Sequence, residues 1–341
     1  MITQIFKGLP IPPHFNSPRV GEVWRVPYQI RVQEAKQWAK QYEIQPASQD
    51  QLKTCLILID LQNTFCIPEF ELFVRGKSGN GAVEDNIRLC EFIYRNLGKI
   101  TEIIATMDTH RAFQIFHPIF WINQQGEHPT PATLISVEDI QNQVWKVNPE
   151  VANNISGIDV QFLEQYALHY AQSLAQKNQY LLTIWPYHSM LGGIGHSLVS
   201  AVEEALFFHS IARCSQVQFE MKGNHPLTEN YSVLQPEVLE DFQGGLIAKP
   251  NQELIENILK FDRILIAGQA KSHCVAWTID HLLTEIQARD IHLAQKVYLL
   301  EDCTSPVVIP GIVDYTEQAN TAFERFAAAG MQIIQSLSLL D

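Results

Sequence analysis

The sequence predicts a three-layer α/β/α protein built on a six-stranded, mostly parallel sheet with Rossmann-like topology. Short apolar runs typical of doubly buried parallel strands recur along the chain. Segments with helical spacing lie between these runs, and this alternation implies right-handed βαβ crossovers. With 341 residues, of which 46% are hydrophobic and 18% charged, the chain can bury the core that this fold needs.

The first 50 residues are predicted to be an N-terminal extension packed on a main domain at 51–341. Four prolines between Pro10 and Pro18 discourage regular structure at the start. A helix is expected near Gln33–Tyr42. No motif in this extension indicates a function.

Strands and helices alternate from residue 55 onward. The predicted strands are Cys55–Ile59, Glu102–Met107, Tyr180–Trp185, Gln216–Met221, Ile264–Ala267 and Lys296–Leu300, and a last apolar run covers Met331–Ile334. The predicted helices are Ala82–Leu97, Asp159–Lys177, His196–Arg213, 273–289 and 314–329.

An insertion interrupts the main domain at about 119–179. A connection of this length in an α/β domain is either a lid or an assembly surface. The sequence leaves these alternatives open.

A candidate nucleophile lies where the fifth predicted strand meets the next helix. The strand Ile264–Ala267 is broken by Gly268, and Cys274 follows at the predicted helix start. Helix N-termini favour ionisation of a thiol, and their free N–H groups can hold an oxyanion. The alternative is an ordinary buried cysteine.

Composition excludes several classes of partner. The net charge of −13 argues against nucleic acid or an anionic membrane surface. No apolar stretch reaches the ~18–20 residues of a membrane span, and no leader segment is recognisable. The six cysteines are scattered and contain no CxxC pair, so we expect a cytoplasmic protein with reduced thiols.

Polar side chains collect at the carboxyl ends of the predicted strands, the edge where open α/β sheets bind ligands. Each has a structural alternative, such as a helix cap for Asp60 or a solvated cation for Lys222. Their coincidence at one edge favours a functional site. They are Asp60, Asp108, His110, His188, Lys222, Cys274 and Asp302.

Part of this edge has the residue types of a metal site. The alternation in Asp108-Thr109-His110 lets two side chains converge on one ion, and His188 could supply a third ligand. One carboxylate and two imidazoles suit Zn²⁺, Fe²⁺ or Mn²⁺. His117 is a candidate for a fourth contact or an outer partner.

Taken together, these motifs resemble the isochorismatase-like cysteine hydrolase superfamily, and within it the nicotinamidases. The resemblance covers about 55–334. The matching pieces are Leu58-Ile59-Asp60-Leu61-Gln62-Asn63-Thr64-Phe65, Met107-Asp108-Thr109-His110, Trp185-Pro186-Tyr187-His188, Lys222-Gly223 with Tyr231-Ser232, Gly268 to Cys274-Val275, and Asp302.

The resemblance implies roles for individual residues. Asp60, Lys222 and Cys274 would form a catalytic triad, and Asp108, His110 and His188 would hold a divalent metal. A cis peptide would fall at Gln269–Ala270, with the N–H groups of Ala270 and Cys274 as an oxyanion hole. The metal expected is Zn²⁺, with Fe²⁺ or Mn²⁺ as alternatives. Phe65, Trp121 and Tyr231 are the candidate substrate-binding side chains.

The implied activity is hydrolysis of a small-molecule amide, nicotinamide to nicotinate and ammonia, through a Cys thioester, as in NAD salvage. A homo-oligomer is expected. One alternative keeps the triad and changes the substrate to another carboxamide or to a ureido or carbamoyl compound. The other is a catalytically silent homologue that binds a metal or ligand.

Overall fold

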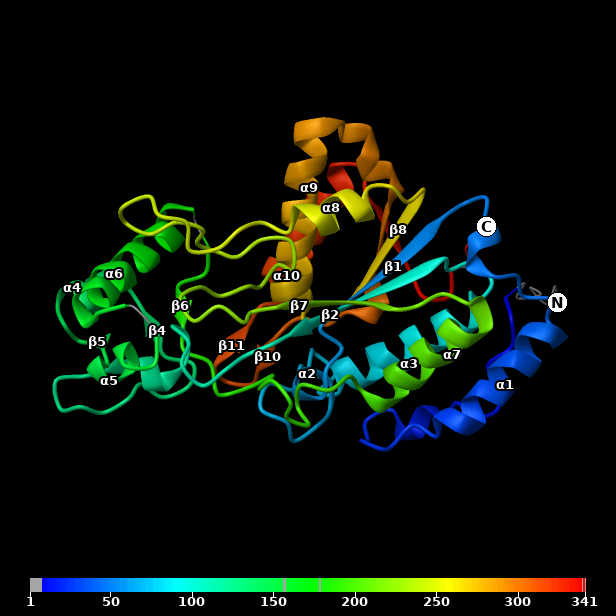
Figure 1. The fold of residues 1–341 in the computed structure, drawn as a ribbon, viewed down its shortest axis with the longest axis horizontal. Coiled ribbons are helices and arrows are strands. Elements are labelled where there is room, and N and C mark those ends of the chain that lie inside the picture. Colours follow the sequence, from blue (N-terminus) through cyan, green and yellow to red (C-terminus); the bar gives the residue numbers. More distant parts are fainter. Residues whose placement is uncertain (1–7, 156–157, 178, 339, 341) are drawn as a thin grey trace.

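A six-stranded parallel sheet forms the centre of the molecule (Figure 1), as the sequence predicts. The computed structural model describes residues 8–155, 158–177, 179–338 and 340. The strand order is β12-β9-β8-β1-β2-β7, and all neighbours are parallel. When these six strands are renumbered 1 to 6 in chain order and counted from the β7 edge, their order is 3-2-1-4-5-6. This is the Rossmann order. The strands are β1 (Thr54–Ile59), β2 (Glu102–Asp108), β7 (Gln218–Lys222), β8 (Arg263–Gly268), β9 (Val297–Leu300) and β12 (Gln332–Ile334).

Alternate residues of the buried strands face opposite helical layers. In β1, Leu56 and Leu58 belong to one apolar cluster, whereas Ile57 and Ile59 belong to the other. Alternation of this kind requires apolar residues at every position of a strand covered on both faces. The first cluster includes α3 (Gly81–Arg95) and α7 (Ser200–Arg213), and the second includes α8 (Gln252–Ile258), α9 (Ala276–Arg289) and α10 (Thr316–Ala328).

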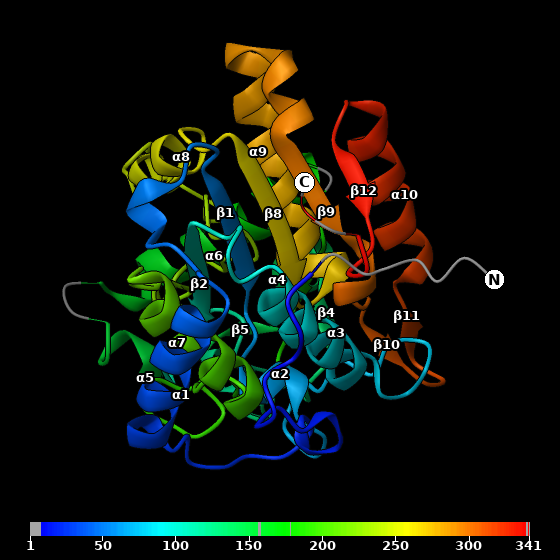
Figure 2. The same cartoon turned by 90° about the vertical axis from the view of Figure 1, so that its right-hand side faces the viewer.

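The N-terminal segment packs outside the first helical layer. Its helix α1 (Tyr28–Gln41) lies beside α7 (Figure 2). Arg31 Nε donates to Glu204 Oε1 at 2.7 Å, and the Ser200 hydroxyl bonds both backbone groups of Trp24. These contacts attach residues 8–50 to the main domain.

The insertion forms a smaller lobe beside the sheet, at the left of Figure 1. Its apolar cluster includes Leu163, Tyr166 and Tyr170 of α6 and also takes in Leu227 and Val238 from outside the insertion. Its elements are β3 (Trp121–Ile122), β4 (Leu134–Ile135), α4 (Val137–Gln141), β5 (Lys146–Val147), α5 (Pro149–Ala152), α6 (Val160–Gln176) and β6 (Leu182–Thr183).

The prediction that Tyr180–Trp185 is a strand of the central sheet is wrong. Only Leu182–Thr183 is extended with a partner, and it pairs antiparallel with β4. Leu182 and Ile184 are buried in the cluster of the smaller lobe. An apolar run indicates burial but does not identify the core that buries it.

The remaining elements are short. They are α2 (Asn63–Cys66) after β1 and the hairpin β10 (Val308–Ile309) and β11 (Val313–Asp314) after β9. A wide helical turn, Lys271–Val275, precedes α9, so Cys274 lies just before the regular helix. No helix in the described ranges is long and apolar enough to cross a membrane.

Candidate active site

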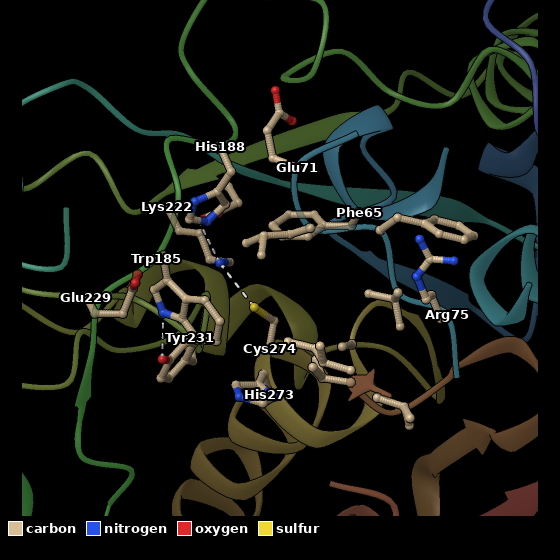
Figure 3. A pocket seen from close by; sticks show the side chains of 18 residues that line it. Phe65, Glu71, Arg75, Trp185, His188, Lys222, Glu229, Tyr231, His273 and Cys274 are labelled. Atoms are coloured by element: carbon tan, nitrogen blue, oxygen red, sulfur yellow. Dashed lines mark hydrogen bonds and ion pairs between the residues drawn. The ribbon is translucent and has the colours of Figure 1, made fainter. Parts of the chain in front are cut away.

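A cavity of about 240 Å³ lies at the carboxyl edge of the sheet, at the switch point between β1 and β8 where ligands bind in this topology (Figure 3). Its walls are mainly apolar and aromatic, with a few polar groups, as in small-molecule sites. The lining residues are Phe65, Glu71, Leu72, Phe73, Val74, Arg75, Asp108, Trp185, His188, Lys222, Glu229, Tyr231, Ala270, His273, Cys274, Val307, Val308 and Ile309.

Glycine 268 brings the candidate nucleophile loop against β1. It has φ +127°, and a Cβ there would lie 2.1 Å from the Ile59 carbonyl oxygen. Only glycine therefore allows this close approach. The loop leads to Cys274, which is 8% exposed and lines the cavity.

The structure brings Asp60, Lys222 and Cys274 together from three different strand ends. Lys222 Nζ lies 3.0 Å from Asp60 Oδ2 and 3.5 Å from Cys274 Sγ. The same ammonium group donates to the Asn230 carbonyl at 2.8 Å and lies 3.0 Å from Asp108 Oδ1. Lys222 thus links the predicted triad to the predicted metal ligands.

Burial sets the protonation of these groups. It raises the pKa of the Cys274 thiol well above its usual value, against the opposing effect of Lys222. It also raises the pKa of Asp60, although Lys222 and a hydrogen bond of 2.5 Å from Thr106 favour the carboxylate. The pKa of Lys222 is raised because Asp108 and Asp60 together outweigh the effect of burial.

The Gln269–Ala270 peptide bond is cis, at the position that the resemblance implies. The Gln269 side chain is not part of the cavity wall and donates to Asp85 Oδ2 at 2.8 Å. Ala270 lines the cavity beside Cys274. Gln269 therefore anchors the loop, while Ala270 is placed to contact a bound molecule.

Asp108, His110 and His188 converge next to the cavity. Asp108 Oδ1 is 3.1 Å from His110 Nε2, and Asp108 Oδ2 is 3.5 Å from His188 Nε2. The buried Gln62 side chain fixes Asp108 by bonding both its backbone groups, each at 2.8 Å. Gly223, at φ +81°, leaves room here, since a Cβ would lie 2.8 Å from both Asp108 Oδ1 and His110 Nε2.

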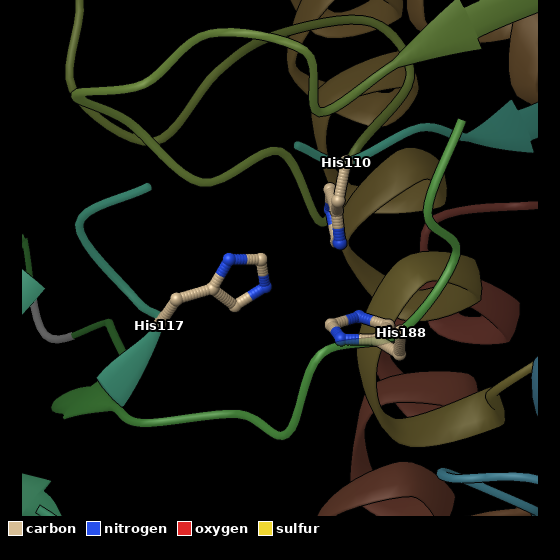
Figure 4. A group of neighbouring side chains, drawn as sticks. All are labelled: His110, His117 and His188. Carbon is tan, nitrogen blue, oxygen red and sulfur yellow. The ribbon is translucent and has the colours of Figure 1, made fainter. Parts of the chain in front are cut away.

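A third imidazole joins the group (Figure 4). One ring nitrogen each of His110, His117 and His188 lies within 4.8 Å of the others. The Nδ1 atoms of His117 and His188 contact the carbonyls of Ala112 and Pro186, which leaves Nε2 of each ring as its candidate ligand atom. Sequence reasoning left His117 open between ligand and outer partner, and the structure places it with the ligand candidates.

The chemistry of this group fits a divalent cation. Nδ1 of His110 and Nε2 of His117 are buried without a hydrogen-bond partner in the described part of the chain, and Nε2 of His110 has only the Asp108 carboxylate at 3.1 Å. Burial lowers the pKa of His110 to about 4 and that of His117 to about 3, so both imidazoles are neutral, as ligands must be.

Sequence reasoning missed Glu229, a buried carboxyl group in the cavity wall. Its Oε1 accepts the Asn230 N–H at 2.8 Å and lies 3.9 Å from His110 Nε2. Burial, reinforced by Asp108, raises the pKa of Glu229 to about 7. Because Glu229 lies seven residues beyond β7 in an irregular segment, no periodicity could place it in the site.

Two of the three predicted substrate-binding side chains line the cavity. Phe65 lies edge-on to His188, and the Tyr231 hydroxyl accepts a hydrogen bond from Trp185 at 3.1 Å. The third, Trp121, is not in the cavity wall. It is fully buried in the smaller lobe, where its Nε1 donates to the Ile115 carbonyl. The prediction for Trp121 is corrected because the lobe's own core takes this ring.

Asp302 also differs from the prediction. Its carboxylate accepts hydrogen bonds from the backbone and hydroxyl of Ser336 at 2.7 and 2.6 Å. It does not line the cavity. Asp302 therefore joins the segment after β12 to the end of β9 instead of contributing to the site.

No protein-family model and no curated protein matches the chain. Among solved structures, the Acinetobacter baumanii nicotinamidase pyrazinamidase is 18% identical and matches 86% of this chain and 100% of its own with a TM-score of 0.50. The yeast nicotinamidase bound to the inhibitor nicotinaldehyde is 19% identical and matches 83% and 99% with a TM-score of 0.50. The chain thus has the isochorismatase-like fold of these nicotinamidases.

Proposed function

We propose that this protein is a cysteine amidohydrolase that converts nicotinamide or a related carboxamide to its acid and ammonia. The observation that carries the proposal is the convergence of three side chains at the cavity: Lys222 Nζ lies 3.0 Å from Asp60 Oδ2 and 3.5 Å from Cys274 Sγ. The shared fold of two nicotinamidases supports it.

In the acylation step, the Asp60 carboxylate accepts the thiol proton of Cys274, and the sulfur attacks the carbonyl carbon of the amide. The carbonyl oxygen becomes an oxyanion, for which the N–H groups of Ala270 and Cys274 are the donors that the resemblance implies. Asp60 then donates its proton to the amide nitrogen. The C–N bond breaks, ammonia leaves, and a thioester remains on Cys274.

In the deacylation step, Asp60 accepts a proton from water as the water oxygen attacks the thioester carbonyl. The C–S bond breaks, the proton returns to the sulfur, and the acid is released. Lys222 stabilises the ionised forms of Asp60 and Cys274 throughout, because its ammonium group is within 3.5 Å of both.

Asp108, His110 and His188, with His117 as a fourth candidate, would hold a divalent cation at the cavity wall. Such an ion would supply a Lewis acid that binds a heteroatom of the substrate. The donor set of imidazoles and a carboxylate suits Zn²⁺, Fe²⁺ or Mn²⁺.

Ammonia release from nicotinamide by the purified protein tests the proposal. A panel of other carboxamides and of ureido and carbamoyl compounds should be assayed in parallel. Cys274→Ala is expected to abolish release, whereas Cys214→Ala, which changes an exposed cysteine, should retain it.

If ammonia is released from a panel compound but not from nicotinamide, the proposed mechanism stands and that compound replaces nicotinamide as the substrate. Release that survives Cys274→Ala would exclude the thioester route. If the folded, metal-loaded protein releases no ammonia from any of these compounds, the chain is a silent binding homologue and the proposal fails.

A further inference from the structure

One helix of the smaller lobe, α6, contacts a segment that carries residues of the active site. Two side chains of α6 and that of Lys177, the residue after the helix, hydrogen-bond carbonyl groups of the segment 227–240, which carries Glu229, Asn230 and Tyr231. Tyr166 Oη donates to the Leu227 carbonyl at 2.9 Å, His169 Nε2 lies 3.0 Å from the Glu240 carbonyl, and Lys177 Nζ donates to the Glu237 carbonyl at 2.9 Å.

A third α6 side chain, Tyr170, reaches the centre of this segment. It is fully buried, and its hydroxyl accepts the backbone N–H of Glu229 at 3.3 Å. A buried N–H needs an acceptor, and the segment is irregular here, so no strand neighbour provides one. The Tyr170 hydroxyl takes the place of that neighbour.

From Glu229 the contacts lead directly to the candidate nucleophile. The next residue, Asn230, accepts a hydrogen bond from Lys222 Nζ on its carbonyl oxygen at 2.8 Å. That carbonyl is the only uncharged oxygen among the polar atoms that the described structure places around Nζ. A shift of this short backbone stretch would therefore move the ammonium group relative to Cys274 Sγ.

We propose that Tyr170 is a positioning residue, which holds the Glu229–Asn230 backbone so that Lys222 is aligned with Cys274. This role would give the insertion a part in catalysis that is neither a lid nor an assembly surface. The part of this inference that concerns turnover rests on the proposed function. Its geometric part, the placement of Lys222 beside the thiol, can be tested without turnover.

The test compares Tyr170→Phe with Tyr94→Phe. Tyr94 is also fully buried, and its hydroxyl bonds His14 at 3.1 Å in the first helical layer, apart from the cavity lining. Both variants lose one buried hydroxyl, so thermal unfolding should show similar losses of stability. Tyr170→Phe is expected to lower kcat about tenfold with little change in KM, because catalytic geometry tolerates small displacements poorly. Tyr94→Phe should leave both constants within about twofold of wild type.

A second readout measures the rate at which iodoacetamide alkylates Cys274, followed by peptide mass spectrometry. Tyr170→Phe should change this rate at least about threefold, since thiol reactivity depends on nearby charge, and Tyr94→Phe should not. Equal alkylation rates in all three proteins would overturn the proposal. If wild type hydrolyses nothing, the proposed function fails, and the alkylation rates alone decide the positioning role.

Discussion

The triad cluster (Asp60, Lys222 and Cys274) and the histidine cluster (His110, His117 and His188) both border Asp108, but they differ in how their polar atoms are satisfied. In the triad cluster, the Lys222 ammonium lies within 3.0 Å of both Asp60 and Asp108. In the histidine cluster, His110 Nε2 lies 3.1 Å from Asp108 Oδ1, but His110 Nδ1 and His117 Nε2 are buried without a hydrogen-bond partner in the described residues.

This difference indicates what each cluster needs. Buried charges persist when they are paired, so the triad cluster is complete with groups of the chain itself. Neutral imidazoles with unpartnered nitrogens are costly to bury unless something binds them. The histidine cluster is therefore expected to gain stability from a cation, whereas the triad cluster is not.

The largest effect is expected for Asp60→Asn in the triad cluster. The amide cannot accept the thiol proton, so turnover should fall about 10²- to 10⁴-fold. The change preserves the shape of the side chain, and a circular dichroism spectrum should match wild type. Near-normal kcat would show that Asp60 has only a structural role.

Lys222→Met should give the largest loss of stability. It leaves Asp60 and Asp108 buried without their counter-charge, and removing one partner of a buried pair costs about 3–5 kcal/mol. Urea unfolding of the metal-free protein measures this, with Lys40→Met on the exposed face of α1 as the control. A loss below about 1 kcal/mol would mean that the carboxyl groups take up protons instead of remaining charged.

Zinc binding tests the histidine cluster. Zn²⁺ at 100 times its dissociation constant should stabilise the wild-type protein by about 2.7 kcal/mol in thermal unfolding. His188→Ala should weaken the affinity at least about tenfold, as elemental analysis and calorimetry can show. His292→Ala, which changes an exposed histidine, should bind as wild type does. Unchanged stoichiometry in His188→Ala would remove this residue from the ligand set.

The smallest effect is expected for alanine substitutions at two glycines that have nearly equal φ. Gly192→Ala (φ +83°) should lose about 1 kcal/mol, the cost of a left-handed non-glycine residue, and Gly223→Ala (φ +81°) should lose more because its Cβ also crowds buried side chains. Only Gly223→Ala directs a Cβ at Asp108 and His110, whereas nothing lies within 4 Å of the Cβ at Gly192. Zinc affinity should therefore fall only in Gly223→Ala. An equal affinity in both would show that the cluster has room to adjust.

Sequence reasoning failed where position depended on packing between distant segments. The run Tyr180–Trp185 looked like a sheet strand, but its buried residues Leu182 and Ile184 belong to the core of the smaller lobe. The same core encloses Trp121, which was expected in the cavity. Glu229 was missed because it lies in an irregular segment whose course follows contacts with α6.

The sequence by itself located the six strands of the central sheet, with Tyr180–Trp185 as one run too many, and the polar residues at the strand ends. Both are local properties, since apolar periodicity reports burial and a parallel sheet collects its carboxyl ends at one edge. Only the tertiary structure decided which of these residues meet. Asp60, Lys222 and Cys274 converge, Asp302 instead bonds Ser336, and His117 and Glu229 join the site. Such distances depend on how β1, β7 and β8 and the smaller lobe pack together, which a linear pattern does not encode.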